Sequence, residues 1–313
     1  MLSLNTPTYS DPSGYQLSDL PKPELNDPKD VIIKVYAASI NPIDVKKADG
    51  MLKMAVKDNE FVKCAEQHIG LKPSISFEDA ASIPLAAMTA LQALRKYRGD
   101  LTGKTVFVPA GLSGTGLFAC QLAKNVFHAG KVITTVSTSK IPKVKELLGE
   151  TTVDEVIDYT KSDPREVIQA GSVDFLFDTI GSSMEFLSLM KPQTGCIISV
   201  STMPSGSQLQ DSSIMDLPHK PTIPFVPRTA LNAMDCVRKL RARRYGVEYS
   251  YMFLESTGED LDELRGHVEE GRLRTVVGTT VPLSDIKAVQ DACQIVYSGK
   301  GGLGKVVIRV AQE

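Results

Sequence analysis

Short apolar runs alternate with segments of helical spacing along the middle of the chain. The runs are rich in β-branched residues, and they predict buried strands over 105–109, 131–136, 155–158, 173–179 and 195–200. Helices are predicted between them, over 117–124, 142–148 and 184–190. Strands and helices that alternate in this way predict an α/β fold with a parallel, doubly wound sheet. Ligands of such sheets bind at the carboxyl ends of the strands.

The pattern outside this region predicts further elements. Strands are expected over 31–37, 61–73 (strand and turn), 246–254, 273–281 and 305–310, and helices over 76–90, 89–98, 232–244, 261–270 and 283–297. Ser76 is the expected N-cap of its helix, with Asp79 as the acidic residue three positions later. The proline-rich segment 201–228 is expected to be a long loop, and 51–60 carries no strand signal.

Three glycines follow the predicted strand 105–109 and precede the predicted helix 117–124. A glycine in such a turn avoids a Cβ that would block the turn or hold a pyrophosphate away from the backbone. The N-terminus of the following helix offers N–H groups and a positive dipole end to a phosphate. The predicted cofactor-binding residues of this turn are Gly111, Ser113, Gly114, Thr115 and Gly116. The alternative is that the glycines serve only close packing.

The end of the second predicted strand indicates which dinucleotide binds. Ser137, Thr138 and Lys143 lie there, and no Asp or Glu occurs between Val132 and Pro142. An acidic residue at this position accepts the ribose 2′-OH of NAD, whereas hydroxyl and basic groups accept the 2′-phosphate of NADP. The sequence therefore favours NADPH over NADH. The alternative is an ordinary solvated helix start that is rich in lysine.

Further polar and small residues end the later strands of the predicted sheet. The candidates for cofactor binding at these ends are Asp178, Thr179, Gly181, Ser199 and Val200. Tyr159 follows the strand 155–158, where it could stack on adenine or be a surface aromatic.

Composition excludes several classes of protein. The chain has 313 residues, 42% of them hydrophobic and 23% charged, which is enough for two domains with a large core. A formal net charge of −2 gives no general attraction to nucleic acid or to an anionic membrane. No apolar run is long enough to span a bilayer, and the N-terminus lacks the layout of a secretion signal, so a cytoplasmic location is expected. The five cysteines are scattered, which predicts neither a disulfide framework nor a metal site.

Four stretches together resemble one known family. They are Ala38–Asp44 (ASINPID), Ala80–Leu94 (AASIPLAAMTALQAL), Val108–Gly116 (VPAGLSGTG) and Gly301–Val310 (GGLGKVVIRV). In these the chain resembles the zinc-independent quinone oxidoreductase and enoyl reductase branch of the medium-chain dehydrogenases/reductases. The resemblance implies a Rossmann domain that binds NADPH, here 88–255, inside a GroES-like β-barrel domain split into 1–87 and 256–313. It also implies that Thr89, Gly114, Thr115, Ser137, Thr138, Lys143 and Tyr159 contact the cofactor and that Asn41 lies near the nicotinamide.

The segment Met51–Glu60 departs from that family. The family has several dozen residues here, including strands of the barrel, so the barrel is expected to be truncated by an internal deletion between Gly50 and Phe61. Three hypotheses stay open. The chain is a reductase that transfers hydride from NADPH to a quinone or an activated C=C, with Asn41 as the catalytic hydrogen-bond donor. Otherwise it binds NADPH without turnover, or it is a splice or gene-model variant without function. A small-molecule substrate is expected, and a homodimer is possible through the strand Tyr249–Phe253.

Overall fold

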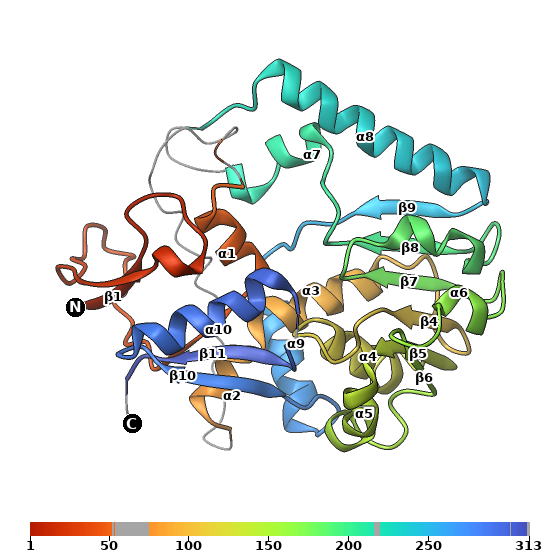
Figure 1. Cartoon of the computed structure of the whole chain (residues 1–313), viewed down its shortest axis with the longest axis horizontal. Helices are drawn as coiled ribbons and strands as arrows, with labels where there is room; N and C mark the ends of the chain where they lie inside the picture. The colour runs from red at the N-terminus through yellow and green to blue at the C-terminus, as the bar shows by residue number, and fades with distance from the viewer. Residues whose placement is uncertain (52, 54–74, 216–219, 301, 312–313) are drawn as a thin grey trace. The chain divides into compact units, whose positions relative to one another are not determined.

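The computed structural model describes residues 1–51, 53, 75–215, 220–300 and 302–311, which fall into two compact units (Figure 1). Unit 1 comprises Met1–Lys53, Asp58–Pro84 and Thr275–Glu313, and unit 2 comprises Met54–Lys57 and Leu85–Arg274. The prediction of strand and turn over 61–73, and most of the expected deletion site, lie outside the described residues.

Unit 2 is built on a six-stranded parallel sheet with the order β6-β5-β4-β7-β8-β9. The strands are β4 (Thr105–Val108), β5 (Lys131–Val136), β6 (Glu155–Asp158), β7 (Phe175–Asp178), β8 (Cys196–Ser199) and β9 (Glu248–Tyr251). Numbered within the sheet, this is the order 3-2-1-4-5-6 of dinucleotide-binding doubly wound folds. The predicted α/β fold with a doubly wound sheet is confirmed. Phe107, Leu176 and Ile197 from three of these strands are buried in one core cluster.

The α-helices of this part of the chain are α3 (Pro84–Arg95), α4 (Gly116–Asn125), α5 (Ile141–Leu148), α6 (Pro164–Val167), α7 (Gly206–Gln210), α8 (Phe225–Arg244) and α9 (Gly258–Glu269). Two predictions were wrong. The helix expected over 184–190 is a pair of 3₁₀ turns, Ser183–Glu185 and Leu187–Leu189, and the loop expected over 201–228 contains α7, a 3₁₀ turn (Ser213–Met215) and the start of α8. Ser205 caps α7, since its hydroxyl accepts from Gln208 N at 3.1 Å. Pro227 does not break α8, because it lies in the first turn, where backbone N–H groups have no partner within the helix.

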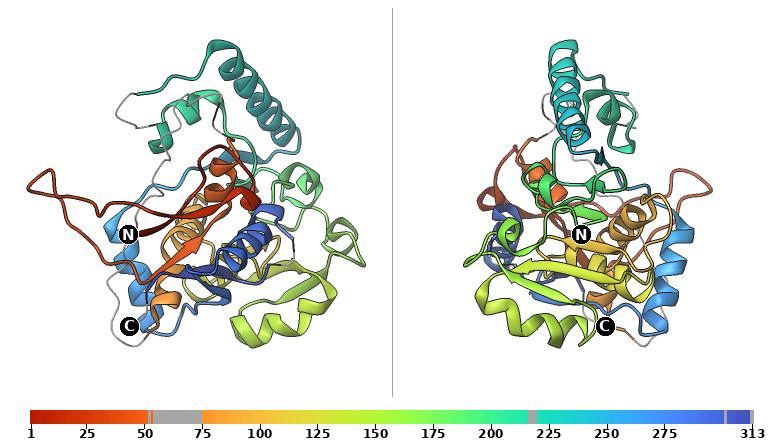
Figure 2. Two further views of the ribbon diagram at one scale, coloured as in Figure 1. Left: turned by 60° about the vertical axis from the view of Figure 1, so that its left-hand side comes forward. Right: turned by 90° about the vertical axis from the view of Figure 1, so that its right-hand side faces the viewer.

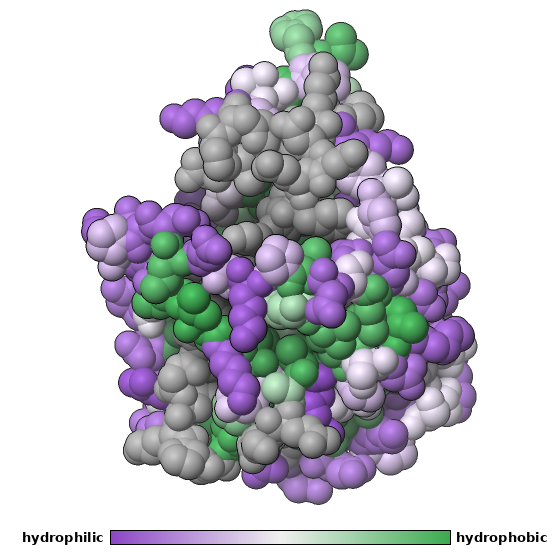
Figure 3. Space-filling view, turned by 90° about the vertical axis from the view of Figure 1, so that its left-hand side faces the viewer, coloured by the Kyte–Doolittle hydropathy of each residue, from purple (hydrophilic) through white to green (hydrophobic). Residues whose placement is uncertain are grey.

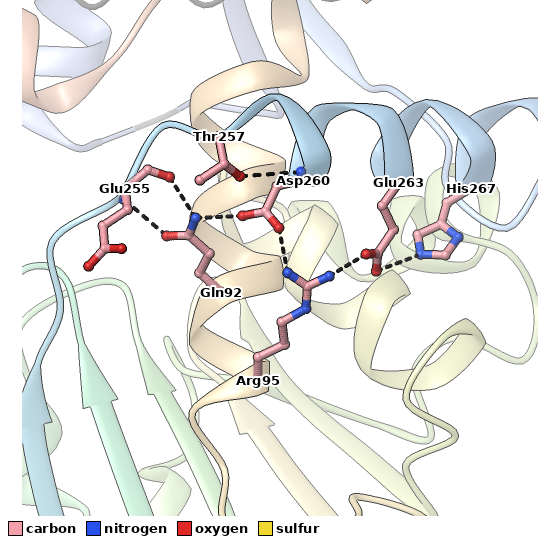
Figure 4. A network of polar contacts seen from close by, with 7 residues as sticks. All are labelled: Gln92, Arg95, Glu255, Thr257, Asp260, Glu263 and His267. Carbon is pink, nitrogen blue, oxygen red and sulfur yellow. Dashed lines mark hydrogen bonds and ion pairs between the residues drawn. The ribbon is translucent and has the colours of Figure 1, made fainter.

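Helix α9 is joined to α3 by a polar network (Figure 4). The Gln92 side-chain amide donates to Asp260 Oδ2 at 2.6 Å and to Glu255 O at 2.6 Å. Arg95 forms ion pairs with both Asp260 and Glu263. All these residues belong to unit 2, which extends to Arg274, whereas the sequence placed the end of the Rossmann domain at 255. The predicted limits of the domains, and whether each domain folds independently, stay a prediction.

Unit 1 contains two small sheets. One is an antiparallel pair of β1 (Leu2–Asn5) and β2 (Gln16–Asp19). The other has the order β10-β11-β3, with β10 (Val277–Pro282) parallel and β3 (Ala37–Ile40) antiparallel to β11 (Lys305–Arg309). Helices α1 (Pro42–Ala48), α2 (Phe77–Ser82) and α10 (Ile286–Ser298) complete it, and Ser76 caps α2 as predicted. The strands of the described residues form no closed barrel.

The strand predicted over Val31–Ala37 is wrong except at its last residue, because β3 begins at Ala37. Figure 2 shows no strand arrow between β2 and β3. Val31 and Ile32 are 77% and 59% exposed. A β-prone sequence becomes a strand only beside a neighbour that completes its hydrogen bonds, and none of the described strands pairs with 31–36. Figure 3 shows hydrophobic side chains gathered in patches on one face of the molecule.

Candidate functional site

The loop between β4 and α4 is held by β5. Ala110 N donates to Thr135 Oγ1 at 3.0 Å, and Gly111 N donates to Thr135 O at 3.3 Å. Ala110 has a φ of 55°, in the left-handed region that a residue with a Cβ rarely adopts. Its carbonyl accepts from Ser113 N at 2.9 Å, so the chain turns sharply here. A strained residue that its surroundings fix is typical of a functional loop.

Two of the three glycines are required for packing within the protein itself. A Cβ at Gly111 would lie 2.1 Å from Thr134 Oγ1, and the Thr134 hydroxyl is itself fixed by a 2.6 Å hydrogen bond to Val108 O. A Cβ at Gly116 would lie 2.3 Å from the carbonyl oxygen of Ala110. Gly111 therefore lets the loop lie against β5, and Gly116 lets α4 begin directly against the loop. Whether these glycines also contact a cofactor stays a prediction.

Helix α4 begins directly after this loop. Ser113 Oγ accepts from Gly116 N at 3.1 Å, and Ser113 O accepts from Leu117 N at 3.1 Å. The positive end of the helix dipole thus lies beside residues 113–116, where an anion would be stabilised. Because β4 neighbours both β5 and β7, the loop lies at the point where the strand order reverses, which is where doubly wound sheets bind their ligands.

Asp178, at the end of β7, supports the next turn. Its side chain is 0% exposed, and Oδ1 accepts from the backbone N–H groups of Ile180, Gly181 and Ser182 at 3.2, 2.7 and 3.2 Å. Oδ2 accepts from the hydroxyl of the equally buried Ser199 at 3.0 Å. The polar atoms of these two side chains hold the turn that carries Thr179 and Gly181, and a contact of Asp178 or Ser199 with a cofactor stays a prediction.

Thr179, Gly181 and Val200 lie where β4, β7 and β8 end together. The Thr179 hydroxyl donates to Pro109 O at 3.0 Å, and Val200 N donates to Asp178 O at 3.1 Å. Gly181 has a φ of 89°, which a residue with a Cβ would adopt only under strain. The structure thus brings these three predicted residues to the same edge of the sheet as the β4–α4 loop, and their contact with a cofactor stays a prediction.

The carboxyl end of β5 carries a feature that the sequence argument missed. The Thr138 hydroxyl donates to Asp158 Oδ2 at 2.5 Å, and Asp158 is the last residue of the neighbouring strand β6. The hydroxyls of Thr138 and Thr160 hold the pKa of Asp158 below its usual range. A carboxylate therefore lies beside the expected phosphate site, although none occurs between 132 and 142. The sequence could have indicated this contact, because the predicted parallel strands 131–136 and 155–158 would end at the same edge of the sheet.

Basic groups follow on the same side. Ser137 precedes the 3₁₀ turn Thr138–Lys140, and Lys143 is exposed in the first turn of α5. Burial, with a smaller effect of the Lys143 charge, lowers the pKa of Lys140. The charges of Lys140 and Lys143 are therefore close enough to act on one another, and the contact of Lys143 with a cofactor stays a prediction. Tyr159, directly after β6, is exposed, so both its sequence interpretations stay open.

The last two predicted residues are engaged within their own elements. Thr89 is buried in α3, and its hydroxyl donates to Leu85 O at 2.6 Å. Asn41 in unit 1 is 7% exposed and precedes α1, where its backbone N–H donates to Asp44 Oδ2 at 2.8 Å. Lys305, which the sequence argument did not select, donates to the side-chain oxygen of Asn41.

The described residues contain no group of three or more His, Cys, Asp or Glu side chains placed to hold a metal ion. Among the same residues, no helix combines the length and the apolar character that a membrane crossing requires.

A sequence-family profile described as zinc-binding dehydrogenase matches residues 151–308, about half of the chain. The chain belongs to the zinc-binding dehydrogenase family. The resemblance to the medium-chain dehydrogenases/reductases is thereby confirmed, while zinc independence stays a prediction.

Individual relatives of this dehydrogenase are distant. It is 26% identical to the mitochondrial NAD(P)H oxidoreductase RTN4IP1 of Mus musculus, over 84% of this chain and 78% of that protein. It is 30% identical to the chloroplastic NADPH-dependent alkenal/one oxidoreductase of Arabidopsis thaliana, over 58% of this chain and 59% of that protein. Among solved structures, the quinone oxidoreductase from Coxiella burnetii has a TM-score of 0.76 at 24% identity, over 99% of both chains.

The alignment with the mouse relative contains gaps in this chain. It runs over 326 positions, more than the 313 residues of the chain, yet uses 84% of the chain. The mouse protein therefore has residues for which this chain has none. This supports the expected internal loss of sequence, and its location between Gly50 and Phe61 stays a prediction.

Proposed function

We propose that this dehydrogenase is an NADPH-dependent reductase that transfers hydride to a C=C bond activated by a carbonyl, or to a quinone. The observation that carries the proposal is the six-stranded sheet in the order 3-2-1-4-5-6, with the glycine loop and the start of α4 at its reversal point. The printed name of the Arabidopsis relative, an NADPH-dependent alkenal/one oxidoreductase, supports the substrate class.

The residues of unit 2 fit a phosphorylated dinucleotide. The backbone around Ser113–Gly116 and the positive end of α4 would hold the diphosphate. Ser137 and the lysines Lys140 and Lys143 would hold the 2′-phosphate, because hydroxyl donors and ammonium groups suit a dianion. The Thr138 hydroxyl would join them by giving up its hydrogen bond to Asp158. The carboxylate of Asp158, whose negative charge is stabilised by the hydroxyls of Thr138 and Thr160, opposes the charge of the 2′-phosphate. Thr179, Gly181 and Val200 would line the middle of the site.

Bound NADPH supplies the hydride, so this chain's own residues have to position the acceptor and polarise its carbonyl. Asn41 is the proposed hydrogen-bond donor for that task. We propose no acidic side chain as the proton donor, and the proton that completes C=C reduction comes from solvent.

The test is a fluorescence titration with NADPH and NADH, followed by NADPH oxidation with an enone and with a quinone. Lys143→Gln should weaken NADPH binding about tenfold, the order of one charge-assisted hydrogen bond, and leave NADH binding unchanged. Lys96→Gln is the control, because Lys96 is also exposed but lies at the end of α3. Equal loss for both coenzymes, or no binding by well-folded protein, would contradict the proposed cofactor.

A second candidate function is NADPH binding without turnover. It is favoured by the alignment gaps and by the exposed, β-prone segment Val31–Val35, which has no strand partner among the described residues. Tight NADPH binding without oxidation by any enone or quinone would support this candidate against the reductase.

Cytoplasmic localisation also stays a prediction, since the name of the mouse relative states a mitochondrial protein.

We also propose a homodimer in which α8 is part of the interface. This helix exposes several apolar side chains, with Phe225 81% and Val226 74% exposed and Met234, Val237 and Leu240 about half exposed. Its last turn exposes arginines as well. Toward the protein it makes both polar and apolar contacts, since Arg238 donates to Met203 O at 2.8 Å and Ala242 is buried in the core. The five exposed apolar residues expose on the order of 500 Å², a large share of the ~800 Å² that each partner buries in a standard interface.

The dimer is tested by sedimentation of wild type and of Val237→Asp. We expect a concentration-dependent dimer that the aspartate shifts to monomer, with NADPH binding retained. Monomeric wild type at tens of micromolar would refute the interface, and monomeric protein that floats with anionic vesicles would indicate a membrane surface as the occupant instead.

A further inference from the structure

Lys305 is a buried lysine whose ammonium group faces Asn41. It is the first residue of β11, which pairs with β3 in the register Val306 to Ile40. Lys305 is therefore brought to the residue that follows β3. Its Nζ donates to Asn41 Oδ1 and, at 3.4 Å, to Ile40 O, and the residue is only 4% exposed. Burying an ammonium group is costly unless its hydrogen bonds are made, so the placement requires these acceptors.

This contact fixes which way the Asn41 amide points. An ammonium group can only donate, so the atom of Asn41 that faces Lys305 must be the oxygen. The amide nitrogen then points to the other side, where Asp44 Oδ2 lies at 3.3 Å and Ser39 O at 3.5 Å. Both distances are at or beyond the long end of hydrogen bonding. The donor side of Asn41 is thus held less firmly than its acceptor side.

We propose that Lys305 is a positioning residue that holds the Asn41 amide with its N–H groups directed toward an acceptor oxygen of the substrate. The role of Asn41 rests on the proposed function, whereas the orientation of its amide rests on contacts within unit 1. Without Lys305, only the two long contacts with Asp44 Oδ2 and Ser39 O would favour this orientation, so the amide would rotate more readily. A rotated amide would present its oxygen, which repels a carbonyl oxygen.

The charge state of Lys305 matters to this arrangement. Burial lowers the pKa of Lys305 to about 8, and the charge of Asp44 on α1 acts in the opposite direction. The ammonium form predominates at pH 7 and enforces the orientation. The neutral amine that forms at higher pH has a lone pair and can also accept, so it no longer excludes the rotated amide.

Two variants of Lys305 separate donation from packing. Lys305→Met keeps the length of the side chain and has no donor, whereas Lys305→Gln keeps an N–H₂ donor and has no charge. We expect Lys305→Met to lower kcat about tenfold with the NADPH dissociation constant unchanged, and Lys305→Gln to restore most of the loss. The kcat of wild type should fall above pH 8, and that of Lys305→Gln should not. Equal damage by both variants would overturn the proposal in favour of a purely structural role.

A double-mutant cycle with Asn41→Ala tests whether Lys305 acts through Asn41. Lys305→Met should cost kcat nothing further in the Asn41→Ala background. A further tenfold loss there would show that Lys305 acts through another group and would overturn the proposal.

A spectroscopic readout keeps the inference distinguishable from the proposed function. In ¹⁵N-labelled protein without cofactor, the Asn41 side-chain NH₂ signal is identified by its loss in Asn41→Ala. It should shift or broaden in Lys305→Met and keep its position in Lys305→Gln. If wild type shows no turnover, the proposed function fails while this shift still supports the positioning of Asn41. An Asn41 signal that Lys305→Met leaves unchanged overturns the positioning, whatever the activity.

Discussion

Gly116→Ala should damage the protein although alanine is the better helix former. The added Cβ would lie 2.3 Å from Ala110 O and 2.8 Å from Ser113 Oγ. Carbon and oxygen atoms need about 3.2 Å or more, so the loop or the first turn of α4 must move by close to 1 Å. Ala110 cannot yield easily, because its carbonyl already accepts from Ser113 N and its φ is strained at 55°.

The magnitude follows from two opposing terms. Forcing a methyl group into a filled space costs about 1–3 kcal/mol, and replacing glycine by alanine in a helix returns about 0.5–1 kcal/mol. The two terms differ by about 0–2.5 kcal/mol, and we expect a net loss near the middle of this range, about 1 kcal/mol, from the free energy of unfolding of unit 2. NADPH binding should weaken at least tenfold, because the displaced atoms belong to the loop that would hold the diphosphate.

Gly266→Ala is the matched control. Gly266 lies inside α9 with no atom within 4 Å of the added Cβ and no positive φ, so this substitution should stabilise by about 0.5–1 kcal/mol. Urea unfolding followed by circular dichroism measures both changes. The chain has no tryptophan, so binding is followed by the fluorescence of NADPH itself. If Gly116→Ala were as stable as Gly266→Ala and bound NADPH normally, the packing argument for the glycine would be refuted.

Three further predictions concern titration, a helix contact and cofactor choice. Burial, together with the nearby charge of Arg272, lowers the pKa of His267 below its unfolded value of about 6.5. The unfolded chain therefore binds the proton more readily, and stability should decrease as pH falls from 7.5 to 5.5, by about 1.4 kcal/mol for each unit by which the pKa is lowered. Urea unfolding across this range should show a smaller slope for His267→Gln, and an unchanged slope would contradict the assignment. Asp260→Ala should cost about 1–3 kcal/mol in the same assay, because it leaves the Arg95 guanidinium without one of its two carboxylates (Figure 4), and a loss under 0.5 kcal/mol would argue against a structural role for the network. Asp158→Asn should tighten NADPH severalfold and leave NADH unchanged in fluorescence titration, and weaker NADPH binding would show that the carboxylate is needed to orient Thr138.

The sequence predicted those features that depend on neighbouring residues. The run Thr105–Val108 and the glycines after it form a local pattern, and the strand, loop and helix were found where that pattern indicated. The segment Val31–Tyr36 has an equally good local pattern, yet strand formation requires a partner from elsewhere in the chain. The start of α8 was missed because Pro227 suggests a loop unless its place in the first turn is known.

The site residues that escaped prediction depend on distant parts of the chain. Thr138 contacts Asp158 from 20 positions away. The contact exists because β5 and β6 are neighbours in the sheet, and that pairing follows from the fold and not from any local sequence pattern. Lys305 contacts Asn41 from 264 positions away, and no spacing rule reaches that far. The family resemblance selected Asn41 but carried no information on what orients its amide.

The sheet of unit 1 joins β3, near the beginning of the chain, to β10 and β11, near its end. We expect that, during synthesis on the ribosome, the nearly continuous unit 2 folds once Arg274 has emerged, while β3 waits without its neighbour. Asn41 acquires its fixed amide only when the last strand docks. A nascent or truncated polypeptide that ends near residue 274 would therefore contain unit 2, which carries the proposed nucleotide site. It would lack β11, and with it the lysine that orients the Asn41 amide.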